Sequence, residues 1–211
     1  LRFDFVKLKE LLNFGKWLFG SSILVFLVTQ GDDAFVGKIL GITTLGFYQM
    51  AYRLSNAPAT EITNVISMVT FPAYSKMQEN ISRMRDAYLN VLQVTLFLSI
   101  PIAGLIFVLA PDFTKIFLGD KWMPMVPAMQ VLAIAGLLLS IEATMAPIFL
   151  ATGRPRIGTF WQSIRLAALV LCIYPLSIQW GIAGTSLAVC ISIAVCTFGS
   201  LLKVADRKST L

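Results

Sequence analysis

The sequence predicts an all-α membrane protein, a bundle of six transmembrane helices. Six apolar stretches fill most of the 211 residues, and each approaches or exceeds the ~20 residues that a helix needs to cross a bilayer. The stretches are continuous rather than alternating, which favours helices over a β-barrel. Only 13% of the residues are charged and mean hydropathy is +0.78, whereas a soluble domain carries about 25% charged residues.

The chain divides into three parts. Residues 1–16 form a mixed-charge amphipathic segment, predicted to lie at the cytoplasmic interface before the chain turns into the membrane. Residues 17–202 form the transmembrane bundle, and residues 203–211 form a cytoplasmic tail. The six predicted spans are Trp17–Gly37, Leu45–Tyr74, Tyr88–Ala110, Val126–Leu150, Phe160–Ile178 and Gly184–Leu202.

Each span has a few distinguishing residues. Two serines, Ser21 and Ser22, suit close helix contact in the first span. A tight connection with Gly41 leads to the second span, which is the most polar. The third and sixth spans are nearly plain. Four spans contain an internal proline, which removes one backbone hydrogen bond and bends a helix. These prolines are Pro58, Pro101, Pro147 and Pro175.

The connections between spans also differ in character. Ser75–Asp86 is predicted to be a polar cytoplasmic loop. The connection between the third and fourth spans carries aromatic residues that are typical of a membrane interface, namely Phe113, Phe117 and Trp122. Pro127 suits the first turn of the fourth span, where a missing N–H costs nothing.

The basic residues predict the topology. Twelve of the 17 Lys and Arg residues lie at alternate ends of the spans, against three on the other side and two within spans. The positive-inside rule then places both termini in the cytoplasm, together with Ser75–Asp86 and Thr152–Gly158. The twelve are Arg2, Lys7, Lys9, Lys16, Lys76, Arg83, Arg85, Arg154, Arg156, Lys203, Arg207 and Lys208; the three are Lys38, Lys115 and Lys121.

Several functional classes are disfavoured. The net charge of +6 follows from topology and indicates no nucleic acid partner. The chain has no His, and its three Cys residues do not form a close pair, so no metal site or Cys–His nucleophile is predicted. Phosphate-loop, nucleophile-elbow and zinc-protease motifs are missing. We therefore predict neither catalytic residues nor a cofactor, and no enzyme activity.

The second span carries a polar stripe at helical spacing, with intervals of three and four residues. A polar stripe is costly against lipid, so it faces other helices or water. It is either an interhelical hydrogen-bonding surface or, as we prefer, the wall of a water-filled cavity. Its members are Gln49, Arg53, Asn56, Thr60, Asn64 and Ser67.

Ionisable residues inside the membrane are candidates for function. Asp33 and Arg53 both lie ~10–12 Å from the outer ends of their helices, at 1.5 Å per residue. They are expected to form an ion pair or part of a site for a charged cargo. Glu61 lies two turns further, near mid-membrane. Glu142 and Arg165 lie nearer the cytoplasmic half, where Arg165 could snorkel to the interface.

Four sequence runs resemble a known family. They are LLNFGKWLFGSSILVFLVTQGDDAFVGKILGITTLGFYQMAYRLSNAP, FPAYSKMQ, LGDKWMPMVPAMQVLA and LATGRP. In order and spacing they resemble the polysaccharide-exporting (Wzx-type) flippases of the multidrug/oligosaccharidyl-lipid/polysaccharide transporter superfamily. The resemblance implies half of a pseudo-symmetric two-lobe transporter, the C-terminal lobe. Residues 1–15 would then be a crossover from a preceding six-helix lobe, and because the chain begins at Leu1, we expect such a lobe upstream.

The resemblance also implies a cargo and roles for individual residues. The cargo would be a polyprenyl-diphosphate-linked oligosaccharide, such as a lipopolysaccharide or exopolysaccharide repeat unit, moved from the inner to the outer leaflet by alternating access. Arg53 would bind the diphosphate. Sugar hydroxyls would contact Gln49, Asn56, Thr60 and Asn64, and ion coupling would use Asp32, Asp33 or Glu61. The family pattern favours Asp32 as the acidic residue of the first span, while the helical face favours Asp33.

Two other functions stay open. A multidrug or small-molecule extruder of the same superfamily would need a less polar cavity, lined by aromatic residues, with a buried acidic residue as its ion site. A membrane scaffold subunit would use its polar residues only to join helices. The length of the hydroxyl-and-amide stripe favours sugar over both.

Overall fold

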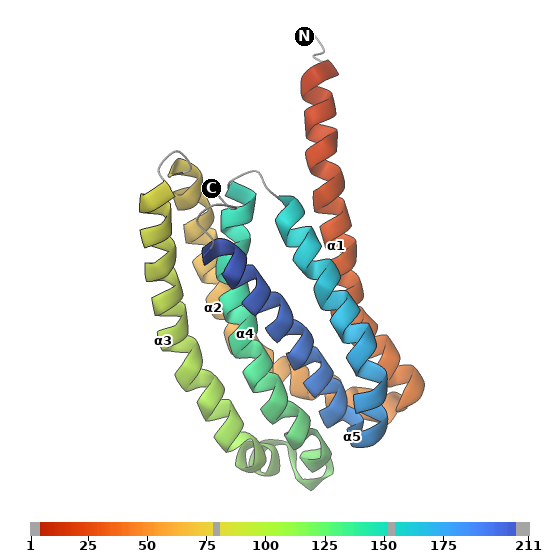
Figure 1. Ribbon diagram of the computed structural model, residues 1–211. Helices are drawn as coiled ribbons and strands as arrows, with labels where there is room; N and C mark the ends of the chain where they lie inside the picture. Colours follow the sequence, from red (N-terminus) through yellow and green to blue (C-terminus); the bar gives the residue numbers. More distant parts are fainter. Residues whose placement is uncertain (1–4, 78–80, 152–154, 206–211) are drawn as a thin grey trace.

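The computed structural model describes residues 5–77, 81–151 and 155–205 (Figure 1). Within these residues every regular element is a helix and there is no strand, which confirms the all-α prediction. The elements are α1 (Phe5–Ile39), α2 (Ile42–Lys76), α3 (Ile81–Phe113), a π-helical turn η1 (Thr114–Leu118), a 3₁₀ turn η2 (Asp120–Met125), α4 (Val126–Ala151) and α5 (Pro155–Ala205).

The long element α5 consists of two arms that reverse direction at Trp180 and Gly181. Both residues have non-helical backbone angles, and Gly181 has φ +57°. At Gly184 any side chain would run into the carbonyl of Leu176, so the second arm can return closely along the first only with glycine there. The two arms correspond to the fifth and sixth predicted spans.

The helices contain the predicted spans and extend beyond them. The expected polar loop Ser75–Asp86 is wrong in extent, because α2 continues to Lys76 and α3 already begins at Ile81. These polar residues extend the helices past their apolar parts. As expected, the first helix begins within the amphipathic segment and runs on into the first span, since α1 is one helix from Phe5 to Ile39. The interfacial position of residues 1–16 stays a prediction.

Three helical segments of the described chain are long and apolar enough to cross a membrane. They are Ser82–Leu118, Asp120–Met145 and Gly158–Leu202, the last containing the reversal of α5. The structure is therefore that of a multi-pass helical membrane protein. The number of six crossings stays a prediction.

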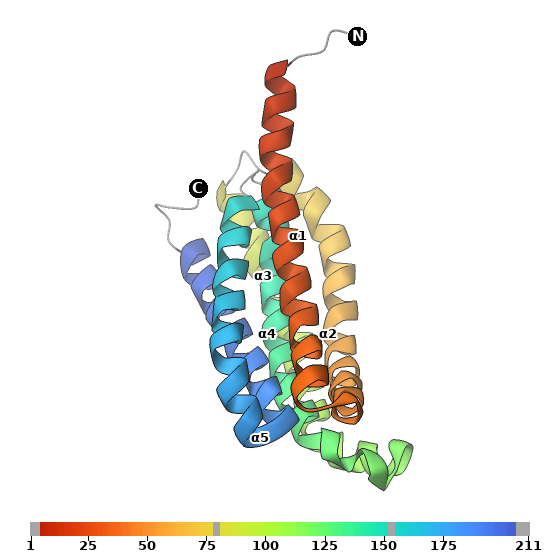
Figure 2. The same cartoon turned by 90° about the vertical axis from the view of Figure 1, so that its right-hand side faces the viewer.

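Helix α4 is the centre of the bundle. It packs most extensively against α2, then against α5 and α3, whereas α1 packs mainly against α5 (Figures 1 and 2). Helix α3 lies at the periphery, and only 11% of its apolar stretch is buried. Four prolines lie inside α3, α4 and α5 without ending these helices, namely Pro101, Pro111, Pro147 and Pro175.

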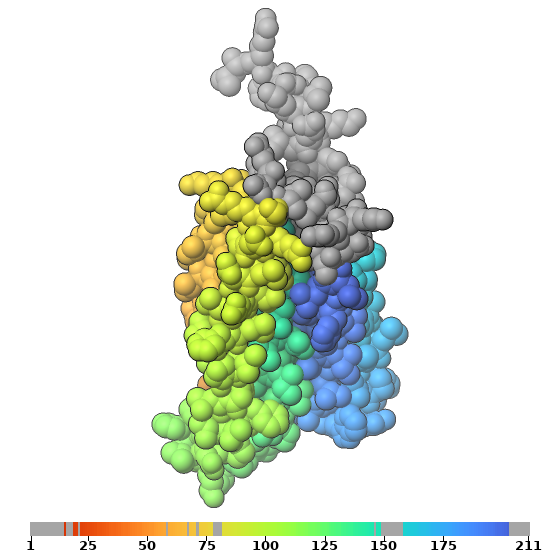
Figure 3. Space-filling view, turned by 60° about the vertical axis from the view of Figure 1, so that its left-hand side comes forward, coloured from red at the N-terminus to blue at the C-terminus, as the bar shows by residue number. Residues whose placement is uncertain are grey.

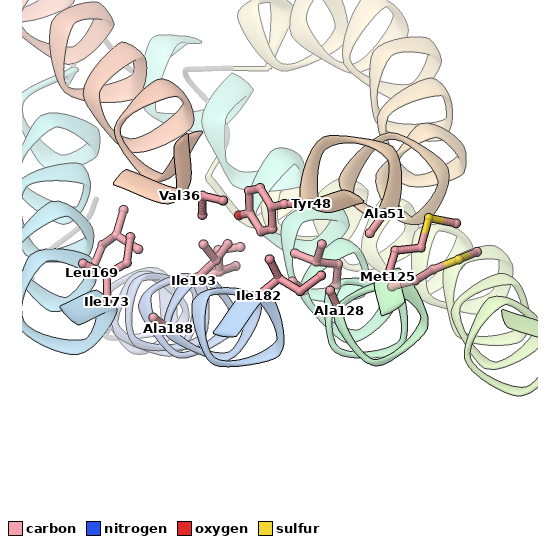
Figure 4. Close-up of a cluster of buried hydrophobic side chains, with 14 of the residues drawn as sticks. Val36, Tyr48, Ala51, Met125, Ala128, Leu169, Ile173, Ile182, Ala188 and Ile193 are labelled. Carbon is pink, nitrogen blue, oxygen red and sulfur yellow. The ribbon is translucent and has the colours of Figure 1, made fainter. Parts of the chain in front are cut away.

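Two buried clusters hold the helices together. The larger joins all five α-helices around Val36, Tyr48 and Met125, all at most 1% exposed (Figure 4), with α3 contributing Ala110. Small residues such as Ala128 and Ala188 within it let the helices approach closely. A smaller cluster at the other end joins α2, α3 and α4 and contains Tyr74, Met84, Tyr88, Met145 and Ile148.

The helices run alternately up and down. The ends of α2, α4 and α5 and the start of α3 lie at one end of the bundle, and the α1–α2 turn, η1, η2 and the α5 reversal lie at the other (Figure 1). The topology predicted from the Lys and Arg residues assumes that successive spans run in opposite directions, and the structure has this arrangement. The membrane side of each end stays a prediction.

Candidate functional site

A polar cavity of about 340 Å³ lies between α1 and α2, close to the turn that joins them. Each of its lining residues carries a polar group, and they include both acidic residues of α1 and the first cation of α2. The lining residues are Thr29, Gln30, Asp32, Asp33, Gln49, Tyr52 and Arg53. The sequence predicted four of these seven residues as functional candidates.

The tight α1–α2 turn determines which residues face each other across the cavity. The N–H groups of Leu40 and Gly41 both donate to the Val36 carbonyl, at 2.9 and 3.1 Å. Gly41 has φ +94°, a conformation that residues with a side chain rarely adopt. As a result, residues 16 positions apart meet across the turn, and two such pairs follow each other along the helices.

Asp32 is the more buried of the two acidic residues, with 2% of its surface exposed. Its Oδ2 accepts a hydrogen bond of 2.6 Å from the hydroxyl of Tyr48, which is itself 1% exposed. Its Oδ1 accepts the backbone N–H of Asp33 at 3.0 Å. Both carboxylate oxygens are therefore held by fixed donors, as a buried charge requires.

Asp33 faces the cavity and is only half-buried. Its Oδ2 accepts a hydrogen bond of 2.9 Å from the Gln49 amide. Arg53 is exposed on the same cavity wall, and among the described residues it forms no ion pair. The Asp33–Arg53 ion pair allowed by the depth argument is thus not formed, and the guanidinium is left available to an anion.

The remainder of the polar stripe does not face one environment. Asn56 is buried against α4, where Gly136 leaves room for it; a Cβ there would lie 3.0 Å from Asn56 Oδ1. That Oδ1 has no hydrogen-bond partner. Thr60 and Asn64 are exposed, as is Glu61. Therefore the part of α2 that carries these residues presents an uncovered polar surface. The side chain of Ser67 lies outside the described residues.

A second charged cluster joins α4 to both arms of α5. Glu142 pairs with Arg165 at 3.4 Å, and their side chains are 16% and 7% exposed. The other oxygen of Glu142 accepts a hydrogen bond from Gln162 at 2.8 Å and from the Cys196 thiol at 3.6 Å. The alternative that Arg165 snorkels to the interface is wrong, because its head group is buried and paired.

Tyr52 is the aromatic residue of the cavity wall. Its ring centroid lies 6.2 Å from that of Tyr48. Tyr48, which donates to Asp32, and Tyr52, on the cavity wall, are therefore neighbours on α2.

Sequence reasoning missed Tyr48, Gln162 and Tyr52. A signal for Tyr48 exists in the sequence, since Asp32 and Tyr48 lie at similar distances on either side of the Leu40–Gly41 turn. Gln162 carries no such signal, because its contact with Glu142 depends on how α4 and α5 rotate against each other.

An all-helical bundle with long apolar helices, a polar cavity and a buried ion pair defines a class, the multi-pass helical membrane proteins. Within that class the chain belongs to a family described as polysaccharide biosynthesis proteins, which matches residues 1–127. This confirms the expected resemblance to polysaccharide exporters. No solved structure matches the chain significantly.

Curated relatives agree with the family. The chain is 30% identical over 177 residues to the teichuronic acid biosynthesis protein TuaB of Bacillus subtilis, covering 83% of the chain and 35% of TuaB. It is 29% identical to the lipopolysaccharide biosynthesis protein WzxC of Escherichia coli, covering 73% of the chain and 31% of WzxC. It is 24% identical to the succinoglycan biosynthesis transport protein ExoT of Rhizobium meliloti, covering 99% of the chain and 42% of ExoT. The chain thus spans less than half the length of these relatives.

Proposed function

We propose that this chain is the C-terminal lobe of a flippase for a polyprenyl-diphosphate-linked oligosaccharide. The cargo would move from the inner to the outer leaflet of a bacterial or archaeal inner membrane by alternating access. The observation that carries the proposal is that Arg53 is exposed on the wall of a polar cavity and forms no ion pair among the described residues. The names of the relatives, which include lipopolysaccharide and succinoglycan biosynthesis, support it.

The physical problem for such a transporter is hydration. A diphosphate and a sugar chain lose strong hydrogen bonds to water when they enter hydrocarbon, at several kcal/mol for each polar group. A cavity lined with amides, hydroxyls and a guanidinium replaces these bonds while the lipid tail stays in the bilayer. The volume of about 340 Å³ is at the lower end of ligand sites, ~300–1,000 Å³, so it suits one part of a head group.

The residues of the cavity would have different roles in binding and ion coupling. Arg53 would bind the diphosphate, since a guanidinium fits phosphate oxygens with two parallel donors. Gln49 would bind sugar hydroxyls once it leaves Asp33, and Asp32 and Asp33 would serve ion coupling. On the uncovered surface of α2, sugar contacts would come from Thr60 and Asn64, and Glu61 would be a further coupling candidate. Asn56, which is buried against α4, would join them only if α2 and α4 separate.

The uncovered surface of α2 needs a partner in the membrane. Thr60, Glu61 and Asn64 are exposed without any helix of the described bundle over them, and exposure of such groups to lipid is costly. A preceding six-helix lobe would cover them and form the second wall of the transport path. The limited coverage of the relatives, 31% to 42% of their length, supports this proposal.

The decisive experiment uses the full-length protein and substitutes Arg53. Arg53→Ala should abolish export of the glycan at normal protein levels, while Arg53→Lys should keep part of it because the charge is retained. Lys38→Ala is the matched control, since Lys38 is exposed and does not line the cavity. Export by Arg53→Ala that stays proportional to protein level would contradict the proposal and favour a scaffold subunit.

A multidrug extruder is the second candidate, because the cavity also holds the buried acid Asp32 and the aromatic ring of Tyr52. Such a protein would expel lipophilic cations, and its loss would leave the cell-surface glycan unchanged. Comparing cation efflux and glycan display in the same deletion strain separates the two functions.

The topology can be tested separately. Single cysteines introduced at Ser82 and Lys121 lie at opposite ends of the bundle, both in exposed positions. With both termini in the cytoplasm, an impermeant maleimide added outside should label only the Lys121 position. The reverse labelling would contradict the orientation.

A further inference from the structure

Residues 113–125 form an arm that leaves the bundle between α3 and α4. The arm contains the turns η1 and η2 and extends sideways from the end of the helices (Figure 2). In the space-filling view it protrudes beyond the outline of the bundle (Figure 3). A direct connection between two antiparallel helices needs only a few residues, so the excursion calls for an explanation.

The base of the arm is firmly packed. Thr114 and Met125 are both completely buried, and the ring of Trp122 meets that of Phe47 edge-on at 5.5 Å. Gly119, with φ +86°, reverses the chain, and its N–H donates to the Thr114 carbonyl at 2.9 Å. Trp122 thus has a structural role in addition to its predicted interfacial one, since its ring packs against Phe47 of α2.

The tip of the arm is apolar and uncovered. Ile116 is 74% exposed and Phe117 is 72% exposed. The Phe117 ring is supported from below by Phe113, at a centroid distance of 4.9 Å. A fixed base that presents two large apolar side chains outward is typical of a surface with an apolar partner.

The surface that leads into the arm indicates what the partner is. Helix α3 is apolar and only 11% of its most apolar stretch is buried, and Leu105 and Val108 are exposed along its last turns. In a multi-pass membrane protein this face lies against lipid. The exposed side chains of the arm continue the same apolar surface at the end of the helix.

Charged residues surround the tip and set its depth. Asp112, Lys115, Asp120 and Lys121 are all exposed, which places them at the level of head groups and water. The two lysines and two aspartates cancel, so attraction to anionic lipid is not needed for binding. The apolar tip is the part that can enter the lipid.

From this continuity we propose that the arm is a membrane anchor that inserts Ile116 and Phe117 into the boundary between head groups and acyl chains. Its partner is the phospholipid of the leaflet at this end of the bundle, zwitterionic lipid being sufficient. The anchor fixes the depth of α3 and α4 and, through Trp122 and Phe47, of the α2 wall of the cavity. The inference does not depend on what the cavity transports.

Site-specific photocrosslinking tests the anchor in the full-length protein. The photoreactive residue p-benzoylphenylalanine replaces Phe117, and after reconstitution into phosphatidylcholine vesicles the adducts are identified by mass spectrometry. The main adduct should be phospholipid, as at the control position Phe198, which is 61% exposed on α5. Substitution of Ile116 provides a second probe if the Phe117 variant does not fold.

Three outcomes would overturn the proposal: adducts mainly with another protein, adducts with a second copy of the chain, or labelling by water-soluble reagents without lipid adducts. A further comparison replaces part of the phosphatidylcholine by phosphatidylglycerol. The yield of lipid adducts should not change, because the charges of the arm balance. If lipid adducts formed only in the presence of anionic lipid, charge attraction and not insertion of the apolar tip would cause the binding, and the proposal would be refuted.

Discussion

Breaking the buried Glu142–Arg165 pair should destabilise the bundle strongly. Arg165→Met removes the cation and leaves a carboxylate with only the Gln162 amide and the Cys196 thiol as donors. Removing one partner of a buried pair costs about 3–5 kcal/mol. We expect a loss of stability near the lower end of this range, because a single contact of 3.4 Å joins the pair. In addition, Arg165 Nε has no hydrogen-bond partner among the described residues.

About 3 kcal/mol corresponds to a fall in Tm of about 6–12 °C for a folding unit of 150–250 residues. Replacing both residues, Glu142→Met with Arg165→Met, should restore most of the stability, since an apolar pair of similar volume needs no compensation for buried charge. The recovery distinguishes an ion pair from two independent packing residues.

The Cys196 thiol provides a direct measurement. It is 1% exposed and 3.6 Å from Glu142, so a thiol-reactive dye reports when this part of the bundle opens. The other two cysteines, Cys172 and Cys190, are replaced by alanine in the reference protein. A temperature ramp in detergent then gives the opening midpoint of each variant.

Arg53→Met is the matched control, because Arg53 is exposed and forms no ion pair among the described residues. Its midpoint should stay close to that of the reference protein, since such surface changes cost within about 0.5 kcal/mol. If Arg165→Met opened no earlier than Arg53→Met, or if the double variant were no more stable than the single one, the energetic role of the pair would be refuted.

Two further predictions use the same measurement. Tyr48→Phe removes a buried hydrogen-bond donor to Asp32 and should lower the free energy of unfolding by about 1–3 kcal/mol. Tyr52→Phe should lower it less, because no hydrogen bond of its hydroxyl is found in the described chain. Equal effects of the two substitutions would contradict the role of the Tyr48 bond. Gly199→Ala would place a methyl group inside the ring of a neighbouring tryptophan and should cost about 1–3 kcal/mol. Gly104→Ala, with open space around it, should be neutral or slightly stabilising, and a loss as large as that of Gly199→Ala would refute the steric reasoning.

The apolar length of the spans was sufficient to predict the helices. The fourth span, predicted as Val126–Leu150, is Val126–Ala151 in the structure, because prolines in the sequence near its start and a polar, proline-containing sequence after it limit the apolar stretch on both sides. The ends of the second and third spans were predicted less well. A helix continues beyond the hydrocarbon region when the polar residues that follow also favour the helical conformation. Hydropathy measures only how apolar a stretch is, so it does not predict where such a helix ends.

The polar stripe of α2 illustrates what a helical period can and cannot predict. The period correctly groups Gln49, Arg53 and Asn56 on one face, yet Gln49 and Arg53 line a cavity while Asn56 is buried. The difference arises on α4, where Gly136 has no side chain and allows the backbones of α2 and α4 to approach. The surroundings of a polar face depend on the volume of the residues opposite it, and those lie about 80 positions away in the chain. A substitution at Gly136 should therefore change the surroundings of Asn56 while leaving the Asp33–Gln49 bond unaffected, so the two parts of the stripe are structurally separable.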